Sequence, residues 1–127
     1  MRNSSTGSYY KERKDFAARK TECETLKAKY ENKIPVIIER YNKERHLNLM
    51  EKTKFLVPGD LYVSKLLMII RDKVRVNENQ AIYLVADNKT ILTMTKTMAE
   101  VYQEHKDEDG FVYITYASQS VFGANSA

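Results

Sequence analysis

The clearest pattern in the chain is a run of apolar residues at helical spacing near its centre. They recur at i, i+3, i+4, i+7 and i+11, which places them on one face of a helix. These residues are Val63, Leu66, Leu67, Ile70 and Val74. Because such a wide apolar face packs on the centre of a core, the pattern predicts the main helix of the domain.

Four stretches rich in β-branched, aromatic and other apolar residues predict strands. They are Ile34–Ile38, 52–57, 81–86 and 111–116. In the first of them, Pro35 suits the first residue of a strand, where a missing N–H matters least. A polar connection separates the first two strands, and we expect these strands to form a hairpin.

Two further segments predict helices. Between Tyr10 and Tyr30, bulky residues fall near helical spacing among charged ones, which predicts one helix or two short ones. Thr97 and Glu100 match a capping box at the start of a short helix, in which each side chain satisfies a backbone N–H. The acidic run Asp107–Asp109 lacks the ligand spacing of a calcium loop, so we interpret it as a solvated helix terminus.

The predicted order is helix, strand, strand, long helix, strand, short helix, strand. A four-stranded mixed sheet folded around the long helix accounts for this order. The predicted class is therefore α+β, with the ubiquitin-like β-grasp arrangement and an added N-terminal helical segment. We expect a flexible N-terminal tail over residues 1–9, the helical segment over 10–32, the ubiquitin-like core over 33–117 and a flexible C-terminal tail over 118–127.

Composition and charge narrow the function classes. The chain has 127 residues, the size of one domain, and its net charge of +4 comes entirely from residues 1–33. Such a basic segment can meet acidic peptides, an acidic protein tail or an anionic membrane face, whereas this excess is small for nucleic-acid binding. No apolar run approaches the roughly 18 residues of a membrane-spanning helix, and no signal segment begins the chain. We therefore expect a cytoplasmic protein.

Side chains that carry enzymatic chemistry are scarce. Cys23 is the only cysteine, which excludes an intramolecular disulfide, and with His46 and His105 alone it lacks the ligands of a structural zinc site. Its place among charged residues at helical spacing favours a packed thiol over a nucleophile. With four glycines and no nucleotide-binding loop, the sequence indicates neither an enzyme nor a resident cofactor.

Five segments carry a resemblance to a known family. They are Lys33–Tyr41, Lys52–Pro58, Lys106–Tyr113, Tyr116–Gln119 and Phe122–Gly123. In order and spacing they resemble the autophagy ubiquitin-like modifiers, and most closely the microtubule-associated protein light chain 3 group. The resemblance covers nearly everything from Tyr10 to Gly123.

The resemblance implies a conjugation chemistry in which this chain is the substrate. A dedicated cysteine protease would cut after Phe122–Gly123, and activating-type and conjugating-type enzymes would carry the new carboxyl group as thioesters to the amine of phosphatidylethanolamine. Glycine suits a narrow active site because it has no Cβ. The acyl chains would anchor the protein to autophagosome membranes, with each buried CH₂ contributing about 0.8 kcal/mol.

The resemblance also implies docking, in which receptor peptides with an aromatic-x-x-aliphatic motif add to the second strand. The residues expected to line an aromatic pocket are Leu26, Pro35, Ile37, Lys54, Leu56 and Phe111. Those expected to line an aliphatic pocket are Phe55, Val57, Pro58, Leu61, Leu66 and Ile69. The basic residues expected to meet acidic flanks of the motif are Arg13, Lys14, Lys52 and Lys54. For Ile37, Leu66 and Ile69, a plain core role is the alternative.

Two departures from the family pattern change these expectations. Arg71-Asp72-Lys73 stands where the family has three basic residues, which weakens any nucleic-acid binding there. Its last residue, Lys73, occupies the position that aids recognition by the protease. Tyr62 stands where the family has a Thr or Asn cap of the long helix, which is expected to cost about 1 kcal/mol unless Asp60 substitutes.

Three other interpretations stay open. A cytoskeletal adaptor would bind the acidic tubulin tails of microtubules through the basic segment Lys11–Lys33 and would need no lipid. It predicts binding that falls steeply with salt and survives Gly123→Ala. A protein-tagging modifier would be joined to lysine side chains instead of a lipid. An enzyme built on Cys23 is the third.

Overall fold

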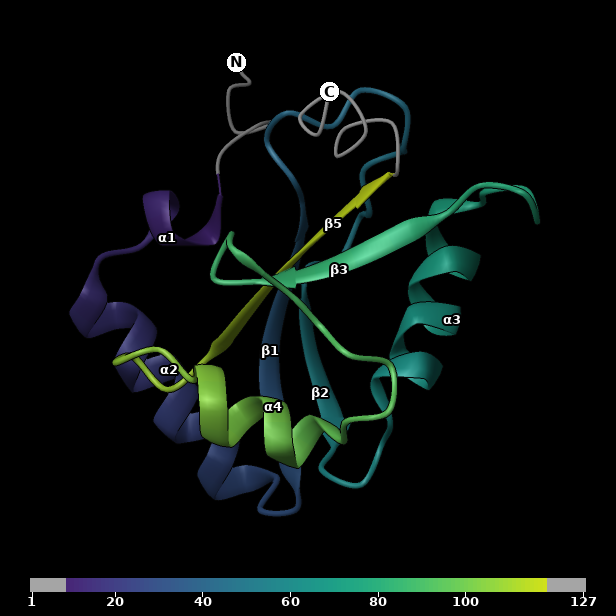
Figure 1. The fold of residues 1–127 in the computed structure, drawn as a ribbon. Coiled ribbons are helices and arrows are strands. Elements are labelled where there is room, and N and C mark those ends of the chain that lie inside the picture. The colour runs from purple at the N-terminus through teal and green to yellow at the C-terminus, as the bar shows by residue number, and fades with distance from the viewer. Residues whose placement is uncertain (1–8, 119–127) are drawn as a thin grey trace.

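The chain folds around one mixed sheet with helices on both faces (Figure 1). A computed structural model describes residues 9–118. The helices are α1 (Tyr10–Arg13), α2 (Phe16–Lys29), α3 (Val63–Val74) and α4 (Met98–His105). The strands are β1 (Lys33–Arg40), β2 (Lys54–Pro58), β3 (Ile82–Ala86), β4 (Thr90–Ile91) and β5 (Val112–Ser118). Their order is β2-β1-β5-β3-β4, in which only β1 and β5 pair in parallel.

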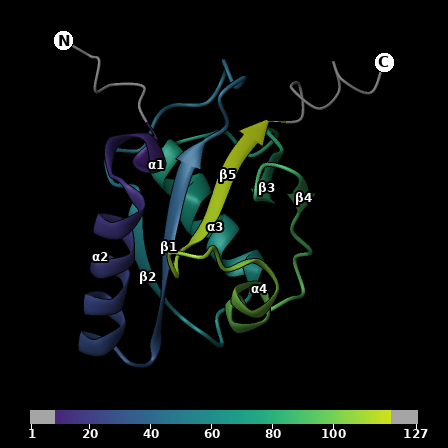
Figure 2. The ribbon, with the colours of Figure 1, turned by 90° about the vertical axis from the view of Figure 1, so that its left-hand side faces the viewer.

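The sheet separates two layers of helices. α1 and α2 cover one face and α3 lies on the other (Figure 2). Side chains alternate between the faces along β1, so Val36 and Ile38 belong to the main core beneath α3, whereas Ile37 belongs to a smaller cluster beneath α2. α4 closes the main core, with Met98 and Val101 fully buried.

The elements with strong local signals form as predicted. The predicted main helix is α3, and four residues of its predicted face are fully buried: Val63, Leu66, Ile70 and Val74. The capping box of α4 is present, because Thr97 accepts from the N–H of Glu100 and Glu100 accepts from the N–H of Thr97. The N-terminal segment forms two helices, and β1 and β2 pair as an antiparallel hairpin.

The sheet has five strands, not the four that the sequence predicts. The additional strand, β4, pairs with β3 after a turn in which Asp87 and Asn88 have φ of 55° and 59°. Both residues of β4 are exposed, so no alternation of buried and exposed positions marks it in the sequence. A two-residue edge strand is too short for hydrophobic patterning to detect.

Order extends further towards both ends than the sequence predicts. Tyr9 belongs to the ordered part of the chain, because its hydroxyl donates to the carbonyl of Arg40 (2.7 Å). Ala117 and Ser118 are buried in β5, so the predicted C-terminal tail over 118–127 begins too early. The other residues of the two predicted tails, 1–8 and 119–127, lie outside the described residues.

Pro35 is the third residue of β1 rather than its first. The N–H of Ile38 donates to Thr53 (2.8 Å), and hydrogen-bonded pairs alternate with non-hydrogen-bonded ones along an antiparallel ladder. Pro35, opposite Leu56, therefore lies in a non-hydrogen-bonded pair with its nitrogen turned away from β2. On that side the register with β5 begins only at Val36, so the missing N–H has no ladder partner to lose.

Tyr62 is the N-cap of α3 and makes no side-chain cap, as predicted. Other groups satisfy the start of the helix, because the N–H groups of Val63 and Ser64 donate to the carbonyls of Lys96 (2.9 Å) and Met94 (3.1 Å). Backbone acceptors from the segment before α4 thus replace the capping side chain. The loss expected for an uncapped helix does not apply here.

Candidate functional site

Strand β2 lies at an edge of the sheet, where its outer backbone groups can pair with a further strand. The ladder alternation described above directs the N–H and C=O groups of Phe55 and Val57 towards β1. The corresponding groups of Lys54 and Leu56 point away from the sheet. These two residues can therefore hydrogen-bond an added strand through their backbone.

The side chains of β2 divide between the two faces of the sheet. Lys54 and Leu56 lie opposite Ile37 and Pro35, so these four side chains share the face covered by α2. Phe55 packs instead on the main core beneath α3. An added strand would alternate in the same way, so two of its residues three positions apart would point to opposite faces.

The structure brings the six residues predicted for an aromatic pocket to the α2 face of the sheet. They are Leu26, Pro35, Ile37, Lys54, Leu56 and Phe111. Ile37 and Phe111 are fully buried and form the floor of this surface. Leu26, Lys54 and Leu56 are partly exposed and surround it. Their role towards a ligand stays a prediction.

Tyr10 completes this surface, and the sequence analysis missed its role. Its side chain is 2% exposed and meets Phe111 edge-on, with 5.5 Å between the ring centroids. The Lys54 ammonium lies 5.5 Å from the Tyr10 centroid. The Tyr10 hydroxyl donates to Glu22, which also accepts from Lys54. Because these partners are far apart in the chain, no local spacing could have signalled the contact.

The rim of this surface is cationic. The charged groups of Arg13 and Lys14 lie 5.9 Å and 5.7 Å from the centroid of the Tyr10 ring. Lys14 also pairs with Glu22 (2.9 Å). Burial, followed by the charges of Lys14 and Arg13, lowers the pKa of Lys54. Two of the residues predicted to meet acidic flanks, Arg13 and Lys14, thus lie beside the aromatic surface.

Glu39 anchors the beginning of α1. Its carboxylate is buried and accepts from the N–H of Tyr10 (2.8 Å). Burial raises the pKa of Glu39, and this exceeds the opposing effects of the Tyr10 hydrogen bond and the Arg13 charge, while Glu12 adds to the rise. Ionisation of Glu39 therefore destabilises the folded state relative to the unfolded chain.

The residues predicted for an aliphatic pocket lie mostly on the main core beneath α3. Those packed in or against that core are Phe55, Val57, Leu61 and Leu66. Val57 and Leu66 are buried, whereas Ile69 on α3 is 37% exposed, and Pro58 is the last residue of β2. Ile69, rather than Leu66, therefore offers accessible apolar surface to a ligand.

Two lysines lie beside the Phe55 ring on this second side. The ammonium groups of Lys52 and Lys73 are 5.7 Å and 5.8 Å from its centroid. Lys52 thus contacts Phe55, whereas Arg13 and Lys14 contact Tyr10. The expected role of Lys73 in recognition by a protease stays a prediction.

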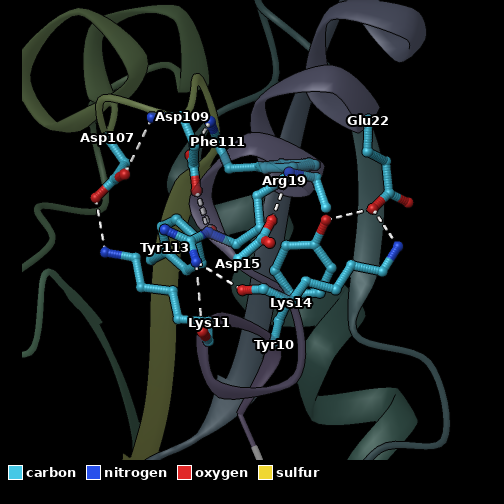
Figure 3. A network of polar contacts seen from close by, with 11 residues as sticks. Tyr10, Lys11, Lys14, Asp15, Arg19, Glu22, Asp107, Asp109, Phe111 and Tyr113 are labelled. Atoms are coloured by element: carbon cyan, nitrogen blue, oxygen red, sulfur yellow. Dashed lines mark hydrogen bonds and ion pairs between the residues drawn. The ribbon is translucent and has the colours of Figure 1, made fainter.

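Asp109 is a buried carboxylate, which corrects the interpretation of the acidic run as a solvated helix terminus. One of its oxygens accepts from Nε of Arg19 (2.9 Å) and from the Tyr113 hydroxyl (Figure 3). The other accepts from the N–H of Phe111 (2.9 Å). A carboxylate without solvent contact needs such partners, and Arg19 of α2 supplies the counter-charge.

Arg19 also holds α1 in place. Its Nη1 donates to the carbonyls of Lys14 (2.8 Å) and Lys11 (3.3 Å) (Figure 3). The hydrogen bond to Asp109 raises the pKa of Arg19, and burial followed by the bond to Asp109 raises the pKa of Tyr113. Arg19 and Tyr113 therefore keep their protons and can both donate to Asp109. Through these hydrogen bonds Arg19 joins α1 and α2 to the beginning of β5.

Cys23 is buried, which confirms the interpretation as a packed thiol. Burial raises the pKa of its thiol to about 11, so little thiolate exists near neutral pH. Gly110, with φ of 98°, lies against it, and a Cβ there would come within 2.7 Å of Cys23 Sγ. The thiol fills the space beside this turn and is not activated as a nucleophile.

The predicted conjugation site falls at the C-terminus, where Phe122 and Gly123 lie outside the described residues. Between residues 9 and 118, no group of three or more His, Cys, Asp or Glu side chains is placed to hold a metal ion. In the same part of the chain, no helix is both long and apolar enough to cross a membrane.

Comparison with known proteins places this geometry in a family. The family model described as "Autophagy protein Atg8 ubiquitin like" matches residues 18–123. The chain is 49% identical to Microtubule-associated protein 1 light chain 3 gamma of Homo sapiens, over 90% of this chain and 78% of that protein. It is 41% identical to Autophagy-related protein 8e of Arabidopsis thaliana, over 94% and 97% of the two chains. The crystal structure of Trypanosoma brucei ATG8 matches with a TM-score of 0.81 at 28% identity, covering 88% and 95% of the two chains.

The five-stranded mixed sheet, the two helices before it and the open edge of β2 define a ubiquitin-like protein with an N-terminal helical extension. The chain belongs to the Atg8 family of autophagy ubiquitin-like proteins. The resemblance found in its sequence segments is thereby confirmed, including its closeness to the light chain 3 group.

We predict that Asp109→Asn lowers the free energy of unfolding by about 3 kcal/mol, because it leaves Arg19 without its buried counter-charge. Asp107→Asn is the matched control on the same turn. It weakens the partly exposed pair with Lys11 (2.7 Å) but leaves an amide oxygen that can accept from the Asp109 N–H (3.1 Å), so it should cost less than about 1 kcal/mol. Guanidinium denaturation measures both values, and a loss at Asp109 no larger than at Asp107 would contradict the assigned role of the buried pair.

We predict that Glu39→Gln stabilises the fold at about pH 7 but not at about pH 4. Because the pKa of Glu39 is raised in the folded state, the protonated carboxyl favours folding. This contribution to stability is fully present below the unfolded-state pKa and is lost as the pH rises through the folded-state pKa. Glutamine keeps an acceptor for Tyr10 and does not titrate. Urea denaturation at both pH values tests this, with the exposed Glu31→Gln as control. A variant less stable than the parent at the higher pH would refute the prediction.

Proposed function

We propose that this chain is a ubiquitin-like modifier that is cut after Gly123 and conjugated through that glycine to phosphatidylethanolamine on autophagosomal membranes. There it docks aromatic-x-x-aliphatic motifs of cargo receptors and autophagy machinery. The observation that carries the docking proposal is the open edge of β2 with an apolar surface on each face of the sheet. Membership of the Atg8 family supports the conjugation proposal.

In the docking step, a receptor peptide adds to β2 and hydrogen-bonds the outward backbone groups of Lys54 and Leu56. Its aromatic residue goes to the α2 face, over the floor of Ile37 and Phe111. The aliphatic residue three positions on is an odd number of residues away, so it points to the other face, where Ile69 is accessible. The spacing of the motif thus follows from the pleat of the added strand.

Charge adds specificity at one end of the motif. Acidic residues that precede the aromatic residue would meet Arg13 and Lys14, which lie around Tyr10. Because these cations are partly or largely exposed, their contribution is to steering and register more than to raw affinity. The excess positive charge of the N-terminal segment would in this way attract the acidic residues of receptor motifs.

In the conjugation step, the chain is a substrate. The thiolate of the processing protease attacks the Gly123 carbonyl and releases residues 124–127, and water then frees the glycine carboxylate. ATP adenylates this carboxylate and releases pyrophosphate, and a thiol of the activating-type enzyme displaces AMP to form a thioester. The chain passes to a thiol of the conjugating-type enzyme by thioester exchange, and the amine of phosphatidylethanolamine displaces that thiol to form an amide. Cys23 takes no part, because it is buried and protonated.

A second candidate function is microtubule binding. A relative at 49% identity carries microtubule association in its name, and the net positive charge of this chain lies in residues 1–33. Exposed lysines such as Lys29 and Lys33 could pair with acidic tubulin tails. Such binding would fall steeply between about 50 and 200 mM salt and would survive Gly123→Ala.

We predict that the chain recovered from cells induced for autophagy lacks residues 124–127 and that part of it carries the added mass of phosphatidylethanolamine. Intact-mass measurement tests this, with Gly123→Ala as the control that should show neither change. A ladder of larger protein conjugates would instead indicate that the acceptor is a lysine side chain of other proteins and not the lipid. An uncut and unmodified chain would contradict the conjugation proposal.

We predict that Lys54→Ala with Leu56→Ala weakens binding of an aromatic-x-x-aliphatic peptide at least about tenfold, or about 1.4 kcal/mol, and leaves lipidation intact. Fluorescence polarisation with a labelled peptide measures the affinity. The matched control is Lys65→Ala with Leu49→Ala, two exposed residues outside the predicted pockets. Retained affinity in the first variant would place the docking surface elsewhere, and loss of lipidation together with binding would indicate misfolding.

A further inference from the structure

The end of β5 is held by a buried carboxylate that the docking surface does not use. Glu44, in the segment after β1, has no exposed surface. Its Oε1 accepts from the N–H of Ser118 (2.6 Å), and its Oε2 accepts from the Ser118 hydroxyl (3.0 Å). The same Oε2 accepts from the N–H groups of His46 (2.9 Å) and Leu47 (3.1 Å).

These four donors explain how a carboxylate can be buried there. Burial alone would raise the pKa of Glu44, yet the hydrogen bonds from Ser118, His46 and Leu47 together lower it below the ordinary value. Glu44 is therefore charged at neutral pH, and its bonds are charge-assisted. Two of the four come from one residue, Ser118.

The segment after β1 also hydrogen-bonds β5 two residues earlier, at Tyr116. The Tyr116 hydroxyl donates to the carbonyl of Asn48 (2.6 Å), and the N–H of Tyr41 donates to the carbonyl of Tyr116 (2.9 Å). On its other side Ser118 lies opposite Ile82 of β3. Ser118 is thus fixed from two sides, and Gly123 follows it by five positions in the chain.

We propose that Glu44 is a positioning residue for processing and conjugation, because it fixes Ser118 as the point from which the chain runs to Gly123. This inference rests on the proposed function. An enzyme that holds the folded body and the glycine together must also position the residues that connect them. Each residue released from β5 adds to that requirement, and ordering one further residue lowers an equilibrium constant by roughly tenfold.

Glu44→Gln tests the inference with little change in shape. An amide has one acceptor oxygen, so it cannot serve both the Ser118 N–H and the donors at the second oxygen position. We expect the KM for cleavage by the family's processing cysteine protease to rise about tenfold with kcat within about twofold, because the loss is one of uniform binding. Glu51→Gln, an exposed residue of the same segment, is the matched control and should leave both constants unchanged.

Ser118→Ala provides a second, milder test of the same contact if Glu44→Gln does not fold. It removes only the hydroxyl donor, so we expect a smaller rise in KM, about two- to threefold, again without a change in kcat. Hydrogen exchange should show faster exchange of the amide of residue 118 in both variants. Affinity for the docking peptide should match that of the parent chain, which verifies that the fold is intact.

The outcomes separate the two proposals. Faster exchange at residue 118 with an unchanged KM would overturn the positioning role and leave Glu44 a purely structural residue. A fall in kcat at constant KM would overturn it as well. A parent chain that is not cut after Gly123 at all would instead refute the conjugation proposal.

Discussion

The pair between Arg19 and the buried Asp109 is the contact on which the position of the two N-terminal helices depends. α2 has little apolar surface of its own to bury, since Cys23 is its only buried residue. Hydrophobic packing therefore cannot hold this helix on the sheet unaided. The side chain of Asp109 has no solvent contact, and that of Arg19 is 11% exposed. A charged pair so far removed from water is costly to form but more costly to break, because removing one partner leaves the other uncompensated. The pair thus determines the position of α2 and adds little to the net free energy of unfolding.

The position of α2 in turn creates one of the two proposed docking surfaces. Leu26 comes from α2 and Tyr10 from α1, while Ile37 comes from β1 and Phe111 directly precedes β5. Without the N-terminal helices, the floor made by Ile37 and Phe111 would keep only the side of its rim that β2 supplies. Arg19 joins both helices to the sheet through one guanidinium, which donates to Asp109 and to the end of α1. The proposed docking site is therefore built by several elements of the fold and not by β2 alone.

Sequence reasoning succeeded where the signal was local and failed where it was distant. The face of α3 and the Thr97 cap repeat within a few residues, so periodicity and spacing predicted them. The acidic run was misjudged because its partner, Arg19, lies far away in the chain and only the folded sheet brings it to Asp109. Ser118 was assigned to a tail for the same reason, since the carboxylate that buries it belongs to Glu44. The pocket residues came from family resemblance, because no alternation of polar and apolar residues distinguishes a pocket floor such as Ile37 from plain core.

Two buried carboxylates bracket β5, the central strand of the sheet. Asp109 lies just before its first residue, Val112, and Glu44 holds its last residue, Ser118. Through Asp109 the beginning of the strand determines where α2 sits and hence the aromatic surface. Through Glu44 its end is fixed at Ser118, which we propose positions the chain for processing at Gly123. The proposed receptor docking and the proposed C-terminal conjugation would thus depend on opposite ends of one strand. Because the whole of β5 separates the two carboxylates, neither belongs to the hydrogen-bond network of the other, which suits the proposed attachment at one end and docking at another surface.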